Sequence, residues 1–148
     1  MIVPSETATI GEIFFDAAQR YADRPLLVAP SNSARAYDPQ GRSLSYAEAA
    51  HAVRGLMAQY REAGYGVGHR VALFLENRLE HMLHKLALNA LGVCCVPVNP
   101  DYRPRELAYL IEHAHVDLAV VLSARVADWE AARHEATWQP PHVVFEQW

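Results

Sequence analysis

The middle of the chain, residues 64–100, places one amphipathic segment between two continuous apolar runs. The runs Arg70–Leu75 and Val93–Val98 lack polar alternation, which is typical of strands buried on both faces of a sheet. Between them, Arg78–Leu91 repeats apolar residues at the spacing of one helical face, with most of its charged residues off that face. A strand, a helix and a strand within roughly thirty residues predict a βαβ unit, whose crossover makes the two strands parallel.

The same pattern repeats towards the end of the chain. Pro104 suits the first position of a helix, where its missing N–H costs no hydrogen bond, and the residues after it carry an apolar stripe. We expect a helix from Pro104, a strand at Asp117–Leu122, a helix at Ala124–Glu135 and the start of a strand at Val143–Phe145. The fold class that follows is α/β, with a mainly parallel sheet and helices on both faces.

Two capping boxes predict helices in the first half of the chain. In Thr9–Glu12 and again in Ser45–Glu48, a hydroxyl residue stands three positions before a glutamate, so each side chain can satisfy an orphan amide group at a helix start. We expect the first helix to end near Tyr21 and the second at Gly64, since glycine is a common C-terminal cap. The segments between these helices predict a small antiparallel hairpin of two short strands, Leu26–Ala29 and Ser43–Ser45.

Length and charge narrow the class of protein. The 148 residues are enough for one domain with a substantial core, and we treat 1–148 as a single α/β domain. A formal net charge of −4 gives no attraction for phosphate backbones, so we expect no nucleic-acid partner. The apolar runs are too short to span a membrane, and the N-terminus lacks the basic start and long apolar core of a secretory signal.

The two cysteines, Cys94 and Cys95, are neighbours on one predicted strand. Side chains of successive strand residues point to opposite faces, so a bridge between them is not expected. We interpret them as small buried side chains in a reducing compartment, which predicts a cytoplasmic location.

The glycine-rich segment at residues 64–68 has the composition of a phosphate-binding loop but not its context. Nucleotide-binding glycines follow a strand and open a helix, whereas these follow a helix and precede a strand, so we interpret them as a helix cap and a turn. The only lysine, Lys85, lies mid-helix and cannot serve a GxxxxGK[ST] loop. No GxSxG nucleophile turn is present either.

The histidines offer a weak case for a metal site. His81 and His84 lie three apart with Glu80 before the first, whereas the zincin motif needs two histidines four apart with the glutamate after the first. His113 and His115 lie near a helix end, where a cation is favourable. We interpret these histidines as solvated or capping residues, and a metal site remains the alternative.

Six segments, taken in order, carry a resemblance to a known family. They are Arg20–Pro25 (RYADRP), Ser43–Glu48 (SLSYAE), Gly68–Asn77 (GHRVALFLEN), Ala90–Val93 (ALGV), Val96–Pro100 (VPVNP) and Pro104–Leu107 (PREL). From about Thr9 to Leu122, the chain resembles the N-terminal region of adenylate-forming (AMP-binding) enzymes, in the acyl-CoA synthetase branch.

The resemblance implies a two-step reaction. A carboxylate attacks the α-phosphate of ATP, with Mg²⁺, to give an acyl-adenylate, and a thiol, usually that of coenzyme A, then displaces AMP. It also implies that the phosphate loop, the ribose-binding aspartate and the catalytic lysine lie downstream of this region. We therefore assign no catalytic, cofactor-binding or metal-binding residue, and we expect the 148 residues alone to be inactive.

Several points stay open after the resemblance. Arg125 follows a predicted strand, near where some relatives place arginines that contact the phosphate of coenzyme A, but the local match is poor and we assign it no role. The chain ends at Trp148 without an element that closes the sheet, which favours an N-terminal part of a larger synthetase. The alternative is a stand-alone α/β module that binds a partner or a small ligand without catalysis, and a homo-oligomer is open in either case.

Overall fold

The computed structural model describes residues 8–146, which divide into two compact units. Residues 8–66 and 78–92 form the first unit, and residues 67–77 and 93–146 form the second. The predicted fold class is confirmed: the chain is α/β, with a parallel four-stranded sheet and a separate antiparallel pair of strands. No helix among the described residues is long and apolar enough to cross a membrane.

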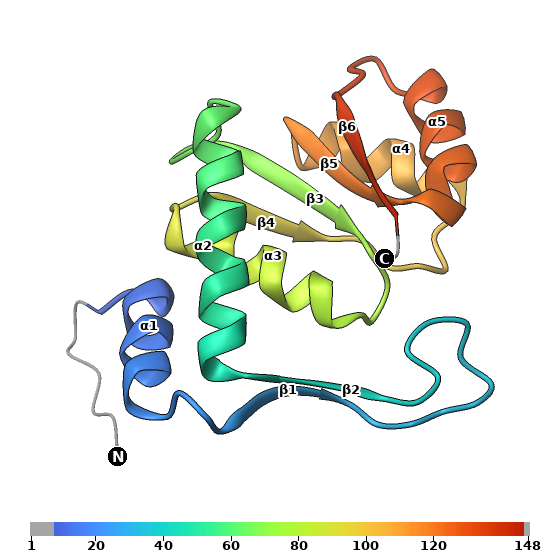
Figure 1. The fold of residues 1–148 in the computed structure, drawn as a ribbon. Helices are drawn as coiled ribbons and strands as arrows, with labels where there is room; N and C mark the ends of the chain where they lie inside the picture. The colour runs from blue at the N-terminus through green and yellow to red at the C-terminus, as the bar shows by residue number, and fades with distance from the viewer. Residues whose placement is uncertain (1–7, 147–148) are drawn as a thin grey trace. The chain divides into compact units, whose positions relative to one another are not determined.

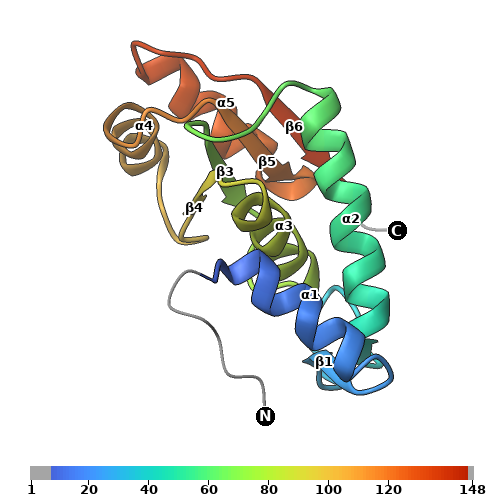
Figure 2. The same ribbon diagram turned by 90° about the vertical axis from the view of Figure 1, so that its left-hand side faces the viewer.

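The first unit consists of three helices and a two-stranded hairpin (Figure 1). Its elements are α1 (Ile10–Arg20), β1 (Pro25–Ala29), β2 (Arg42–Ser45), α2 (Tyr46–Glu62) and α3 (Leu79–Ala90). The three helices pack side by side (Figure 2), and β1 pairs antiparallel with β2, as predicted.

Both predicted capping boxes are present and explain where α1 and α2 begin. The Thr9 amide donates to Glu12 Oε2 at 2.7 Å, and the Glu12 amide donates back to Thr9 Oγ1 at 3.2 Å. Ser45 and Glu48 repeat this arrangement with the same two distances. The backbone and hydroxyl hydrogen bonds hold the pKa of both glutamates below the ordinary value, because they stabilise the charged carboxylate.

The second unit carries the parallel sheet. Its elements are β3 (Arg70–Phe74), β4 (Cys94–Pro97), α4 (Pro104–His113), β5 (Leu118–Leu122), a short 3₁₀ turn η1 (Ser123–Arg125), α5 (Val126–Glu135) and β6 (His142–Phe145). The strand order is β4-β3-β5-β6, and every neighbouring pair is parallel. The periodicity therefore identified each strand and helix of this unit.

Burial differs between the central and the edge strands of this sheet. All five residues of β5 and four of the five residues of β3 are buried, whereas β4 and β6 have no fully buried residue. The prediction that Cys94 and Cys95 are buried is wrong, because β4 is an edge strand: Cys94 is exposed and Cys95 is half-buried. Both cysteines are thiols rather than partners in a disulfide.

The core of the second unit lies between the sheet and its two long helices. Apolar residues of α4 and α5 pack onto alternate residues of β3 and β5. The buried members of this cluster include Ala72, Phe74, Leu107, Ile111, Ala119, Val121, Trp129 and Ala132. Burial of apolar area at roughly 25 cal/mol per Å² is the main favourable term that holds α4 and α5 on the sheet.

A pair of glycine substitutions tests the helix packing of the first unit. A Cβ at Gly11 of α1 would lie 2.8 Å from Cα and Cβ of Ala90 in α3, whereas one at Gly55 of α2 would meet no atom within 4 Å. We expect Gly11→Ala to lower the free energy of unfolding by roughly 1–3 kcal/mol through overpacking. Gly55→Ala should raise it by about 1 kcal/mol through helix propensity.

Urea denaturation of both variants and the parent chain measures the difference. Shifts of the same sign in the two variants would contradict the close approach of α1 and α3.

Candidate functional site

The direction in which successive strands are added to the sheet reverses next to β3. The chain runs from β3 to β4 on one side of β3 and then to β5 on its other side. In open α/β sheets a reversal of this kind leaves a crevice outside the carboxyl ends of the strands, and ligands bind there. The residues that follow β3 and β5 therefore form the candidate site of the second unit.

Three charged side chains meet at this place. Arg125, at the end of η1, directs its Nε to Glu76 Oε1 at 3.2 Å, and its Nη1 lies 3.4 Å from Asp128 Oδ2. The Arg125 guanidinium also lies 5.7 Å from the centre of the Phe74 ring, within the range of a cation–π contact. The arginine is thus oriented by two carboxylates and by the last aromatic side chain of β3.

Glu76 has an unusual backbone conformation. Its φ is +57°, in the left-handed region that residues other than glycine, asparagine and aspartate rarely adopt. Strained residues of this kind concentrate at functional sites and persist only where their surroundings hold them. Sequence reasoning did not single out Glu76, although its position directly after a buried apolar strand was an available signal.

The Glu76–Arg125–Asp128 cluster can hold a half-exposed guanidinium in place, but it carries no surplus positive charge. The Arg125 side chain is 31% exposed and already faces two carboxylates, so an anion would have to displace one of them. The cluster contains no nucleophile paired with a base. The sequence alone assigns Arg125 no role. The structure adds that two carboxylates hold its side chain in a defined position.

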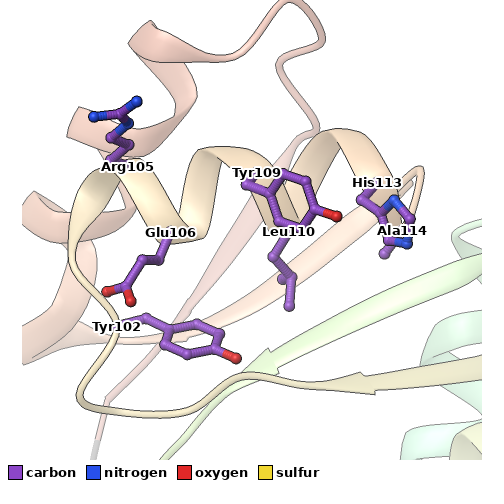
Figure 3. Close-up of a pocket in the computed structure, with 7 residues that line it drawn as sticks. All are labelled: Tyr102, Arg105, Glu106, Tyr109, Leu110, His113 and Ala114. Carbon is purple, nitrogen blue, oxygen red and sulfur yellow. The ribbon is translucent and has the colours of Figure 1, made fainter.

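A pocket of about 500 Å³ lies against α4 and the loop that precedes it (Figure 3). Its lining residues are Tyr102, Arg105, Glu106, Tyr109, Leu110, His113 and Ala114. Tyr109 and His113 stack with ring centres 5.2 Å apart, as expected for residues one turn apart on a helix. Arg105 extends away from Tyr102 and Leu110, whereas the Glu106 carboxylate points to the same side of α4 as Tyr102 (Figure 3).

The histidines occupy several different environments. His84 of α3 is 8% exposed and lies 2.8 Å from the Tyr60 hydroxyl of α2, so its interpretation as solvated or capping is wrong. Burial, with a further contribution from the nearby charge of His81, lowers the pKa of His84 from 6.5 to about 4. The position of His84 explains the burial, because it lies on the inward face of α3 with Leu83, Ala87 and Leu88, at the three- and four-residue spacing of one helical face.

Neither the paired histidines nor the glycine-rich segment at residues 64–68 forms a ligand site among the described residues. No group of three or more His, Cys, Asp and Glu side chains in residues 8–146 could hold a metal ion. Gly64 and Gly68 have φ values of +86° and +94° in the turn that links α2 to β3, as the cap-and-turn interpretation predicts. Lys85 is exposed in the middle of α3.

Comparison with known proteins identifies the family. Residues 14–146 match the profile of the AMP-binding enzyme family, almost the whole of the described chain. The chain belongs to the AMP-binding enzyme family. A long-chain-fatty-acid–CoA ligase of Thermus thermophilus is 33% identical over 103 residues, which is 70% of this chain and 19% of the ligase.

Solved structures agree with this family at the level of the fold. A luciferase-like enzyme from the nonluminescent mealworm Zophobas morio matches 99% of this chain and 33% of its own, with a TM-score of 0.84 and 18% identity. The anthranilate CoA ligase AuaEII, in complex with anthranoyl-AMP, matches 93% of this chain and 25% of its own, with a TM-score of 0.79 and 17% identity. The chain thus spans about a fifth of the curated relatives it matches and a quarter to a third of these solved chains.

Two substitutions at Glu76 test the left-handed turn after β3. Asparagine tolerates a positive φ, whereas the β-branched side chain of valine does not. Both remove the carboxylate that faces Arg125, so the comparison isolates the backbone. We expect Glu76→Val to be less stable to urea than Glu76→Asn by roughly 1–2 kcal/mol. Equal stability of the two variants would show that Glu76 does not hold this conformation in solution.

A pH titration of stability tests the burial of His84. An unfolded histidine titrates near 6.5, so between about pH 6.5 and pH 4 the unfolded chain binds a proton that folded His84 does not. The free energy of unfolding should therefore fall by up to about 3 kcal/mol as the pH is lowered through this window.

In the double variant His84→Leu/Tyr60→Phe, which removes both partners of the buried hydrogen bond, this loss should disappear. His51→Gln, on the exposed surface of α2, is the matched control and should keep it. Urea denaturation at intervals of half a pH unit measures the slope. A double variant with the same slope as the parent would contradict the assignment to His84.

Proposed function

We propose that this chain is the N-terminal part of an AMP-dependent acid–thiol ligase. The enzyme would activate a carboxylic acid with ATP to an acyl-adenylate and then transfer the acyl group to coenzyme A. The observation that carries the proposal is the family match over residues 14–146, together with curated relatives that are named long-chain-fatty-acid–CoA ligases. A solved relative of the same fold holds an acyl-AMP, the intermediate that this reaction requires.

Two observations on the described residues support a separate location for the groups that bind ATP and Mg²⁺. The glycine turn at residues 64–68 leads into a strand rather than a helix, so it presents no helix N-terminus to phosphate groups. No set of three metal-ligating side chains converges anywhere in residues 8–146. We therefore propose that the groups that bind these molecules belong to further sequence, as the greater length of the relatives suggests.

On this proposal the present residues have a supporting role. The parallel sheet and its helices would wall one side of the larger enzyme, and 148 residues alone would be inactive. The proposal includes a cytoplasmic location.

Exchange of labelled pyrophosphate into ATP tests the first half-reaction. We expect a longer protein, made of this chain and the sequence that the gene encodes after Trp148, to catalyse exchange with at least one acid from a panel of fatty and aryl acids. The 148-residue chain should give no exchange above a control without protein, because it lacks a phosphate-binding loop.

Exchange by the 148-residue chain would contradict the division of roles. No exchange by the longer protein with any acid would contradict the proposed reaction. A stop codon directly after Trp148 would favour the stand-alone module instead.

A further inference from the structure

The segment that joins β1 to β2, residues 30–41, is much longer than a usual hairpin loop. Such loops commonly have roughly two to five residues, and longer ones without secondary structure are usually functional or disordered. This segment, here called the strap, is held instead by a dense set of polar contacts. These contacts join residues of the strap to one another.

Arg35 organises the strap from within. Its guanidinium donates hydrogen bonds to three carbonyl oxygens of the strap, those of Pro30 at 3.0 Å, Tyr37 at 2.7 Å and Asp38 at 2.6 Å. Charge-assisted hydrogen bonds are stronger than neutral ones, and the fixed fork of a guanidinium orients its acceptors. Backbone hydrogen bonds, such as that from the Asn32 amide to the Pro39 carbonyl at 3.0 Å, close the strap on itself.

Tyr37 links the strap to the start of α3. Its ring centre lies 4.9 Å from the Arg35 guanidinium and 3.9 Å from that of Arg78, the residue directly before α3. Cation–π contacts contribute roughly 0.5–2 kcal/mol each, more where the cation is removed from water. The tyrosine is thus held between one arginine of the strap and one arginine of the helix start.

A second contact attaches the same two parts of the first unit. Arg42 follows the strap, and its Nη1 lies 2.6 Å from Oε1 of Glu80 in the first turn of α3, a residue whose side chain is only 15% exposed. Two independent contacts therefore reach the first turn of α3 from the strap and its end. Helix ends fray readily unless they are fixed, so these contacts bear on the least stable part of the helix.

We propose that the strap acts as a latch, which means that its contacts through Tyr37 hold the first turn of α3. The strap and this turn then unfold together as one local unit. This inference is independent of the proposed ligase activity, since it depends only on contacts within the first unit.

Amide hydrogen exchange of the 148-residue chain, under conditions where the rate reports the opening equilibrium, tests the latch. Two amides are informative. The amide of Asn32 in the strap donates to the Pro39 carbonyl, and the amide of His81 in α3 donates to the Arg78 carbonyl. The amide of Val53 in α2 serves as the reference. Tyr37→Leu should accelerate exchange at Asn32 and His81 by about tenfold and leave Val53 unchanged, because it removes both cation–π contacts. Tyr37→Phe, which keeps an aromatic face, is the matched control and should resemble the parent.

Arg78→Lys provides a second arm if Tyr37→Leu does not fold. Lysine keeps the charge but loses the planar stacking surface, so the same two amides should accelerate together. Acceleration at Asn32 without His81 would overturn the latch, because the strap would then open alone. Equal effects of Tyr37→Leu and Tyr37→Phe, or equal acceleration at Val53, would overturn it as well.

Discussion

The parallel alignment of β3 and β5 is the constraint on which the second unit depends. Two parallel strands cannot be joined by a tight turn, because the chain must return to the end of the sheet where the first strand began. This crossover connection usually contains a helix. Because β3 and β5 are central and buried, their backbone groups must find partners in the ladder and their side chains must be apolar. The alternation of apolar runs and amphipathic segments in the sequence is the direct result of this requirement.

Periodicity was therefore a sufficient guide to the elements of the chain. The helix starts at Thr9 and Ser45 were predictable because a capping box is a local interaction over four residues. The lateral order of the strands was less accessible, since it depends on which elements pack together rather than on any short motif. The error over Cys94 and Cys95 has this origin: an apolar run predicts a strand, but only the strand order reveals that β4 is an edge.

Long-range pairs of polar residues were the other part that the sequence did not predict. Tyr60 and His84 are separated by 24 positions, and Glu76 and Arg125 by 49, so no spacing rule links either pair. Each pair is nevertheless understandable once the fold is known. His84 lies on the inward face of α3 and needs a hydrogen-bond partner there, and Glu76 and Arg125 follow two adjacent parallel strands whose carboxyl ends coincide.

The charged cluster of Glu76, Arg125 and Asp128 lies at the reversal next to β3, and its contribution there has to be explained by its geometry. An arginine paired with two carboxylates adds little stability where the side chains are partly exposed, because solvent screens the interaction. The left-handed backbone of Glu76 adds strain rather than stability. Orientation is a better explanation than stabilisation: the cluster fixes one guanidinium at the edge of the sheet where ligands of this fold class bind. Because both carboxylates already face Arg125, the cluster holds the guanidinium in one position without offering a free positive charge.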